Sequence, residues 1–217
     1  MAAIREIERA GGIVVIGPSG GLYLHGHVAN EWMGTCDEVS DVFLSDVQGT
    51  DDTLRHVSRL PTIKHLFLDR ARVTDAGLAQ LRFLTSLEQL DLSDTQITDA
   101  GLLRLQGLTN LTSLHLSNTQ VGDAGLANLQ ILTQLERLDL EGTAVTDAGL
   151  VHLRGLIKLE VLQLDLTHVT DAGLLHLRGM TRLESLTLGN TKVSPSGVAE
   201  LQRALPKLEI STVTVKM

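Results

Sequence analysis

The hexapeptide VTDAGL at residues 73–78 recurs at a fixed step and decides the fold. Its copies and variants begin 24 residues apart, at Val73, Ile97, Val121, Val145, Val169 and, as VSPSGV, at Val193. A repeat of this length is one supersecondary unit that is too small to bury its own apolar face. The period therefore predicts a solenoid in which each unit packs on the next.

Leucines that precede each VTDAGL copy form columns with the same period. Two columns lie two residues apart, so their side chains point to one face of a strand. They are Leu66, Leu90, Leu114, Leu138, Leu162 and Leu186, and Leu68, Leu92, Leu116, Leu140, Leu164 and Leu188. With a third column, Ile63, Leu87, Leu111, Leu135, Leu159 and Leu183, they complete the frame LxxLxL and predict one short strand per block.

The second half of each block changes to helical spacing. In AGLLRLQGL (100–108), apolar residues stand three apart, which indicates a short helix. We expect Thr98 to cap this helix and Asp99 to place a negative charge at the positive end of its dipole. Gly101 lowers helix propensity by about 1 kcal/mol relative to alanine, so we expect that a side chain there would clash with the neighbouring coil.

The chain divides into an array and two ends. Blocks of 24 residues run from Cys36 to Arg203, which makes seven repeats (36–203), the first of them degenerate. Residues 1–35 are predicted to form an N-terminal cap, a short helix followed by a β-hairpin, with Trp32 as its lid, and residues 204–217 a closing strand. Strands pair ~4.8 Å apart and helices pack ~8–10 Å apart, so the strands take the shorter side. The predicted architecture is one right-handed α/β solenoid with a parallel sheet on the concave face and short helices on the convex face.

The frame LxxLxLxxT followed by VTDAGLxxL resembles the leucine-rich repeat family over about residues 36–217. It is most similar to repeats of planctomycete bacteria, and more loosely to ribonuclease-inhibitor-like and F-box-associated repeats. The family usually has Asn at the turn, where this chain has Thr95, Thr119, Thr143, Thr167 and Thr191. We hypothesise that each buried Thr hydroxyl bonds the turn backbone in place of the amide. The resemblance implies a protein-recognition scaffold that usually binds through its concave strand face.

The composition argues against several classes of function. A net charge of −8 disfavours binding to nucleic-acid phosphates, which requires clustered Lys and Arg. No apolar run approaches the roughly 18–20 residues that span a bilayer, and the charged opening MAAIREIERAGG does not resemble an export signal. The chain has a single cysteine, Cys36, which suits a reducing compartment. We therefore expect a cytoplasmic protein that binds neither nucleic acid nor membrane.

Residues between the leucines of the frame are expected to face solvent on the concave side, where the middle of the face is acidic. We predict that this surface binds another protein, expected to be basic, through Phe67, Asp69, Asp91, His115, Arg137, Asp139, Glu141, Gln163 and Asp165. His115 is expected ~5 Å from both Asp91 and Asp139, which favours the imidazolium form and makes the surface pH-sensitive. The other interpretation is that these charges only keep the concave face soluble.

A second possible role is structural. The closing strand leaves a sheet edge, and Phe43 and Phe67 are adjacent in a column that is expected to be exposed, so either could mediate self-association. The alternative for the two rings is that the N-terminal cap covers them. The oligomeric state stays open, with a monomer favoured.

Metal binding is not expected. His25 and His27 lie on one strand face, with Cys36 and Asp37 not far along the chain, but their spacing matches no recognised zinc pattern. The stretch GIVVIGPSGG (12–21) lacks the Lys and Ser/Thr that complete a phosphate-binding loop, so it predicts a hairpin turn.

Catalysis is not expected either. Asp91, His115 and Asp139 suggest acid–base chemistry, but an open, shallow face lacks the water-excluding pocket that shifted groups require. The sequence contains no GxSxG nucleophile motif. We therefore predict a protein that is not an enzyme and has no cofactor.

Overall fold

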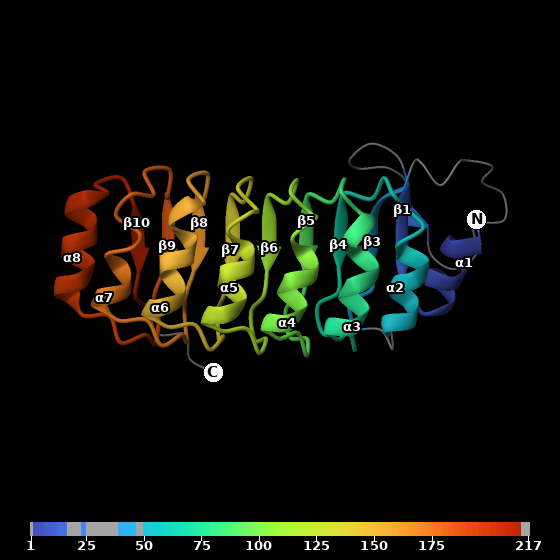
Figure 1. Ribbon diagram of the computed structural model, residues 1–217, viewed down its shortest axis with the longest axis horizontal. Coiled ribbons are helices and arrows are strands. Elements are labelled where there is room, and N and C mark those ends of the chain that lie inside the picture. The colour runs from blue at the N-terminus through green and yellow to red at the C-terminus, as the bar shows by residue number, and fades with distance from the viewer. Residues whose placement is uncertain (1, 17–22, 25–38, 47–49, 214–217) are drawn as a thin grey trace.

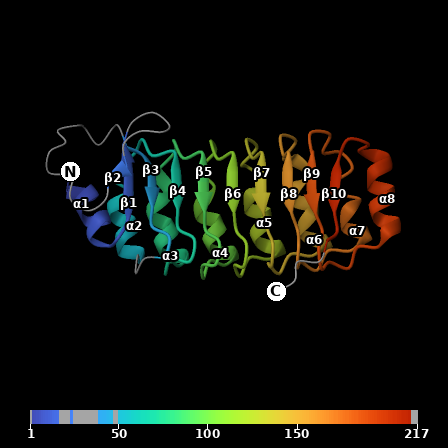
Figure 2. The same cartoon turned by 180° about the vertical axis from the view of Figure 1, so that it is seen from behind.

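The computed structural model describes residues 2–16, 23–24, 39–46 and 50–213. Its elements form two layers, a sheet and a row of short helices that covers one face of it (Figure 1). From the opposite side, the sheet lies in front of the helices (Figure 2). The predicted α/β solenoid, with strands on the concave face and helices on the convex face, is confirmed.

The strands form one sheet in the order β10-β9-β8-β7-β6-β5-β4-β3-β1-β2. Strands β3 to β10 are parallel, and each residue lies opposite the residue 24 positions later, as Leu66 lies opposite Leu90. The parallel strands are β3 (Val39–Phe43), β4 (His65–Phe67), β5 (Gln89–Asp91), β6 (Ser113–His115), β7 (Arg137–Asp139), β8 (Val161–Gln163), β9 (Ser185–Thr187) and β10 (Glu209–Ser211). The sequence period thus sets the register across the whole array.

The N-terminal end is built differently from the repeats. The helix α1 (Ala2–Arg9) buries Ile4 and Ile7, and β1 (Ile13–Ile16) pairs antiparallel with both β2 (Tyr23–Leu24) and β3. The helix and the hairpin strands expected near this end are therefore present. The boundaries 1–35, 36–203 and 204–217 stay predictions, and the turn at 17–21, His25, His27, Trp32 and Cys36 lie outside the described residues.

The leucine columns form the core between the two layers. Leu66, Leu90, Leu114 and Leu162 are 0% exposed, and the third column is buried as well. The core is one continuous cluster that runs from α1 to Leu208. Each coil therefore completes its burial only against its neighbours, as a stacked repeat requires.

The helices are short, and most begin at the Asp of the repeated motif. They are α2 (Asp51–Val57), α3 (Asp75–Leu78), α4 (Asp99–Leu102), α5 (Asp123–Leu129), α6 (Asp147–Leu150), α7 (Asp171–Leu174) and α8 (Pro195–Ala204), with 3-10 turns η2 (Ala79–Phe83), η3 (Leu103–Leu105) and η4 (Val151–Gly155). The expected cap is present, because Thr98 Oγ1 accepts a hydrogen bond from the Ala100 N–H at 3.2 Å. The same bond is made at Thr74, Thr146 and Thr170.

The Asp at each helix entrance also joins its coil to the next one. Asp75 Oδ1 accepts from the Thr98 N–H at 2.9 Å, and Asp75 Oδ2 accepts from the Thr98 hydroxyl at 2.6 Å. Equivalent pairs link Asp51 to Thr74, Asp123 to Thr146, Asp147 to Thr170 and Asp171 to Ser194. At Asp99 the link is reduced to the Gly122 N–H, because glycine supplies no hydroxyl. We call these six carboxylates the entrance aspartates.

The recurrent glycine leaves space for this carboxylate. A Cβ at Gly101 would lie 2.3 Å from Asp75 Oδ1, and one at Gly149 would lie 2.4 Å from Asp123 Oδ1. The expected clash with the neighbouring coil is therefore present, and its partner is the entrance aspartate of the preceding coil. Thr, Asp and Gly of the motif form one contact between coils.

The turn after each strand is held by the threonine that replaces asparagine. Thr95 Oγ1 donates to the Leu92 carbonyl at 2.5 Å, and Thr119, Thr143, Thr167 and Thr191 make the same bond three residues back. The hypothesis that the hydroxyl bonds the turn backbone is confirmed. Each bond stays within its own coil.

The C-terminal end closes with α8 and β10. The helix is longer than the others and buries Leu201, while β10 pairs with β9 on one side and ends the sheet. The α8 helix lies beyond β10 along the array in both views (Figures 1 and 2). Up to residue 213, where the described part of the chain ends, this end therefore has no antiparallel strands like those at the N-terminal end.

Candidate partner-binding surface

The predicted site residues lie in three parallel rows across the strand face. The middle row contains Phe67, Asp91, His115, Asp139 and Gln163, which occupy equivalent positions on β4 to β8. His115 is thus paired in register with Asp91 on one side and Asp139 on the other. Its Nδ1 lies 3.9 Å from Asp139 Oδ2.

An aromatic pair extends the middle row toward the N-terminal end. Phe43 and Phe67 stack with ring centroids 4.6 Å apart and planes 4° from parallel. Ile13 on β1 lies opposite Phe43. All three side chains are partly exposed, so the rings are only partly covered.

Two of the predicted carboxylates are partly occupied by their own strand ends. Asp91 Oδ1 accepts from the Ser93 N–H, and Asp139 Oδ1 accepts from the Glu141 N–H, each at 2.9 Å. Such side chain to backbone bonds are typical of aspartate at turns. They hold one oxygen of each carboxylate and fix its direction on the strand face.

Asp165 differs from the expectation that it faces solvent. It is 6% exposed, and it accepts hydrogen bonds from the Gly189 N–H at 2.7 Å and from the Thr187 hydroxyl. The Val213 carbonyl lies close to Gly189, where a Cβ would be 2.3 Å from it. Asp165 is therefore a buried link to the last coil and contributes charge rather than a contact.

The acidic charge is concentrated around Glu141. Burial, followed by the charges of Asp139, Asp165 and Asp94, raises the pKa of Glu141 above its ordinary value. Burial also raises the pKa of Asp139, although the Glu141 N–H and His115 oppose the shift. Burial and neighbouring negative charges therefore both disfavour the ionised form of these two carboxyl groups.

The remaining predicted residues border this cluster. Asp69 accepts from the Ser45 hydroxyl and lies 3.0 Å from Arg70, so its charge is partly neutralised. Arg137, in the first row, is exposed, and Gln163, in the middle row, is half-buried. Asp69 thus lies at the aromatic end of the surface and is already paired.

Ser113, His115 and Asp139 are close enough to raise the question of catalysis. Ser113 Oγ lies 3.0 Å from His115 Nε2. However, β6 is paired on both sides, so its backbone N–H groups donate within the sheet and leave no oxyanion site beside the 8% exposed serine. The bond therefore orients the imidazole on the surface.

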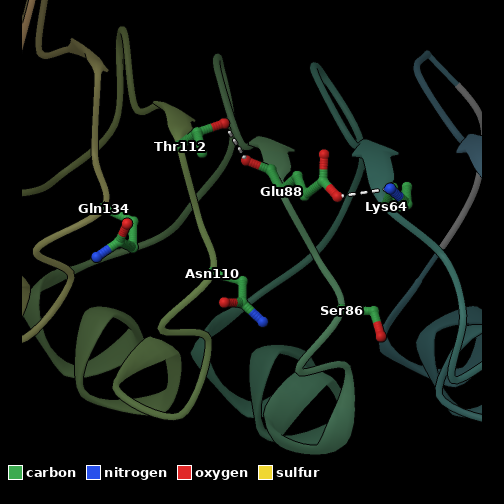
Figure 3. A pocket seen from close by; sticks show the side chains of 6 residues that line it. All are labelled: Lys64, Ser86, Glu88, Asn110, Thr112 and Gln134. Carbon is green, nitrogen blue, oxygen red and sulfur yellow. Dashed lines mark hydrogen bonds and ion pairs between the residues drawn. The ribbon is translucent and has the colours of Figure 1, made fainter.

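Two polar hollows meet at Thr112. One, of about 400 Å³, lies on the strand face and is lined by Gln89, Thr112, Ser113, His115, Glu136 and Arg137. The other, of about 410 Å³, lies on the segments that lead into the strands (Figure 3). Several of its polar groups already have partners. Lys64 pairs with Glu88 at 2.7 Å (Figure 3), Asn110 donates to the Thr85 carbonyl, and Gln134 accepts from Lys158, so the hollow offers few free groups.

Comparison with known proteins places this architecture. Similar solved structures include two internalins of Listeria monocytogenes, internalin C2 (TM-score 0.61, 23% identity, 96% of this chain and 92% of that one) and InlF (TM-score 0.63, 20% identity, 83% and 56%). A leucine-rich repeat protein of Leptospira interrogans follows (TM-score 0.52, 20% identity, 72% and 44%). At these identities the likeness shows the fold alone. The family model "Leucine Rich repeats (2 copies)" matches residues 85–128.

The chain is a leucine-rich repeat protein. Leucine-rich repeat domains generally act by binding other proteins. This leucine-rich repeat protein spans about half the length of InlF, 56% of that chain. A search of curated proteins finds no significant match. The closer similarity to planctomycete repeats stays a prediction.

Within the described residues of this leucine-rich repeat protein, no helix has the length and apolar character needed to cross a bilayer. Across the same ranges, His, Cys, Asp and Glu side chains nowhere gather in threes in a way that could hold a metal ion. His25, His27, Cys36 and Asp37 lie outside these ranges, so the expectation about them stays untested.

Proposed function

We propose that this leucine-rich repeat protein is a non-enzymatic scaffold whose strand face binds a basic surface of another protein. The observation that carries the proposal is the placement of three carboxylates together: Asp91 and Asp139 flank His115 in the middle row, and the Glu141 N–H bonds Asp139. Asp94 and Asp165 add to the negative field at Glu141. Carboxylates that repel one another gain most from a cationic partner, which favours both specificity and fast association. The binding set narrows to Phe67, Asp91, His115, Arg137, Asp139, Glu141 and Gln163, since Asp69 is paired and Asp165 is buried.

The half-buried carboxylates of the strand face supply a direct test. A variant with Asp91, Asp139 and Glu141 changed to Lys is used beside wild type for affinity capture from a lysate of the source organism. A matched control changes Asp52, Glu184 and Glu200 to Lys, because these exposed residues lie in helices or before β9, outside the three rows of the strand face, and give the same net charge. We expect wild type and the control to retain a protein that the first variant loses. Equal capture by all three would overturn the proposal, provided circular dichroism shows that each is folded.

We further propose a cytoplasmic location and a monomeric state. The single Cys36 and the acidic composition support the first, and cell fractionation tests it. For the second, the observation that favours the alternative of self-association is the end position of β10 in the sheet, with Val213 73% exposed beside it. Sedimentation at rising concentration distinguishes the two, because a constant monomer mass rules out pairing through β10.

A further inference from the structure

The middle row of the strand face changes character along the array. In register it runs Ile13, Phe43, Phe67, Asp91, His115 and Asp139, so an apolar end passes directly into an acidic one. The chain has only three phenylalanines, and two of them stack here. The two halves therefore form one continuous strip across β1 to β7.

Polar groups on both sides of the aromatic pair are already paired with each other. In the first row His65 Nδ1 bonds Asp41, and in the third row the Ser45 hydroxyl bonds Asp69. These pairs do not compete for a ligand over the rings. They form a polar border around an apolar centre, the arrangement found around interface hot spots.

The spacing of the strip sets the spacing of its ligand. Strands lie ~4.8 Å apart, so the middle of the Phe pair is ~7 Å from Asp91 and ~17 Å from Asp139 in the row. An extended chain advances ~3.3 Å per residue. Because a lysine side chain spans several further ångströms, cationic residues about two and four positions from an apolar residue fit the two carboxylates.

We propose that the strip binds an extended peptide segment that lies across the strands, with an aliphatic or aromatic side chain on Phe43 and Phe67 and Lys or Arg residues over Asp91 and Asp139. The inference rests on the proposed function and adds the order and spacing of the partner's residues. The carboxylates of Asp91 and Asp139 favour the cationic residues of the peptide through charge complementarity, and the stacked Phe rings favour its apolar residue.

Three synthetic peptides of about ten residues test the order. The first has Phe followed by Lys two and four positions later in a Ser/Gly background; the second replaces its Phe by Ser; the third has the composition of the first with Phe between the two Lys. We expect wild type to bind the first about tenfold more tightly than the other two. That ratio should persist at high salt, whereas the absolute affinity of each peptide should fall.

Variants assign the two halves. In Phe67→Ser, the first and second peptides should bind equally; in Asp91→Asn/Asp139→Asn, all three should weaken. Phe67→Leu keeps an apolar side chain, so it is the control that separates loss of the apolar contact from misfolding of the serine variant. A photoreactive group in place of Phe in the first peptide should label residues of β3 and β4, and not of β8 and β9.

The outcomes separate this inference from the proposed function. If the basic peptides bind and the tenfold preference is absent, or survives in Phe67→Ser, the inference is overturned and the acidic dock remains. Labelling at β8 and β9 overturns it as well. If no basic peptide binds wild type at low salt, both this inference and the proposed function are overturned.

Discussion

Two sets of carboxylates in this protein occupy positions of the same 24-residue repeat, but they differ in how many hydrogen-bond partners the fold gives them. The entrance aspartates, such as Asp75 and Asp123, accept two hydrogen bonds from the following coil, and the pattern recurs from coil to coil. On the strand face, Asp91 and Asp139 keep one oxygen outside such backbone bonds, and Glu141 is crowded by like charges. The first set is saturated by the fold, whereas the second leaves charge for a partner.

The difference teaches how to separate structure from function in a repeat. A residue that recurs in each coil and has all its partners within the array maintains the stacking. A residue that changes from coil to coil, at a position that only has to face solvent, is free to serve recognition. The comparison predicts opposite responses to mutation at the two sets.

The largest effect is expected at an entrance aspartate. Asp123→Ala removes both acceptors of Thr146 and leaves the Thr146 N–H without its bond, so the unfolding free energy should fall by about 3 kcal/mol. Urea denaturation measures it. The control Glu141→Ala, on the strand face, should change stability by less than about 0.5 kcal/mol. Equal losses at the two positions would break the comparison.

A smaller loss is expected from Gly149→Ala. The new Cβ would lie 2.4 Å from Asp123 Oδ1 and displace it from Thr146, which outweighs the gain in helix propensity and should destabilise by about 2 kcal/mol. Gly155→Ala is the matched control, because nothing lies within 4 Å of a Cβ there. In an Asp123→Ala background the loss at Gly149 should largely vanish, and an additive double mutant would contradict the shared contact.

Gly122→Thr should stabilise the protein. At Gly122 the motif lacks the hydroxyl that Thr or Ser supplies in the other coils. The φ of Gly122 is −131°, which a side chain tolerates. A Cβ there would lie 3.7 Å from Asp99 Oδ2, an ordinary van der Waals distance. A threonine there restores both the second bond to Asp99 and the helix cap, which should raise the unfolding free energy by about 1 kcal/mol. Thermal denaturation tests the gain. Gly122→Ala, which has no hydroxyl, should give less of it.

The smallest effect is expected at Glu141 and depends on pH. Its pKa is raised in the folded protein, so the folded state binds its proton more tightly than the unfolded state does. The Glu141 contribution to stability is therefore most favourable below the ordinary Glu range and is lost as pH rises through the folded pKa. Glu141→Gln should stabilise by a few tenths of a kcal/mol at neutral pH and by nothing below about pH 4. A gain of the same size at both pH values would exclude like-charge crowding as its cause.

Much of the fold could be predicted because the residues that build it recur at equivalent positions of the 24-residue repeat. The leucines two residues apart, the Thr at the turn and the Gly in the helix each recur at 24 residues, and each has the contact that its chemistry suggested. What local reasoning missed is the main role of Asp99 and its equivalents. The dipole argument considers the helix that follows the aspartate, whereas its hydrogen bonds go to a residue 23 positions later.

The candidate site was harder to predict, because alternation gives the direction of a side chain and not its partners. Asp165 points to the strand face as expected, but Thr187 and Gly189 of the next coil bury it. The small Gly189 in a row of polar residues was the available signal. In the same way, the shared column of Phe43 and Phe67 predicted that they are neighbours, but their parallel stacking depends on side-chain rotation, which alternation does not give.

The contact between coils also has a polarity. Each coil offers a carboxylate to the coil that follows it, and it offers a hydroxyl, an N–H and a glycine space to the coil that precedes it. Any two coils with this motif therefore have matching surfaces. Removing or duplicating one 24-residue segment that carries the complete motif leaves the carboxylate, hydroxyl, N–H and glycine contact at its junctions chemically the same. The array can thus change length by whole units, and so slide its aromatic end nearer to or farther from its acidic centre, without a new junction having to evolve.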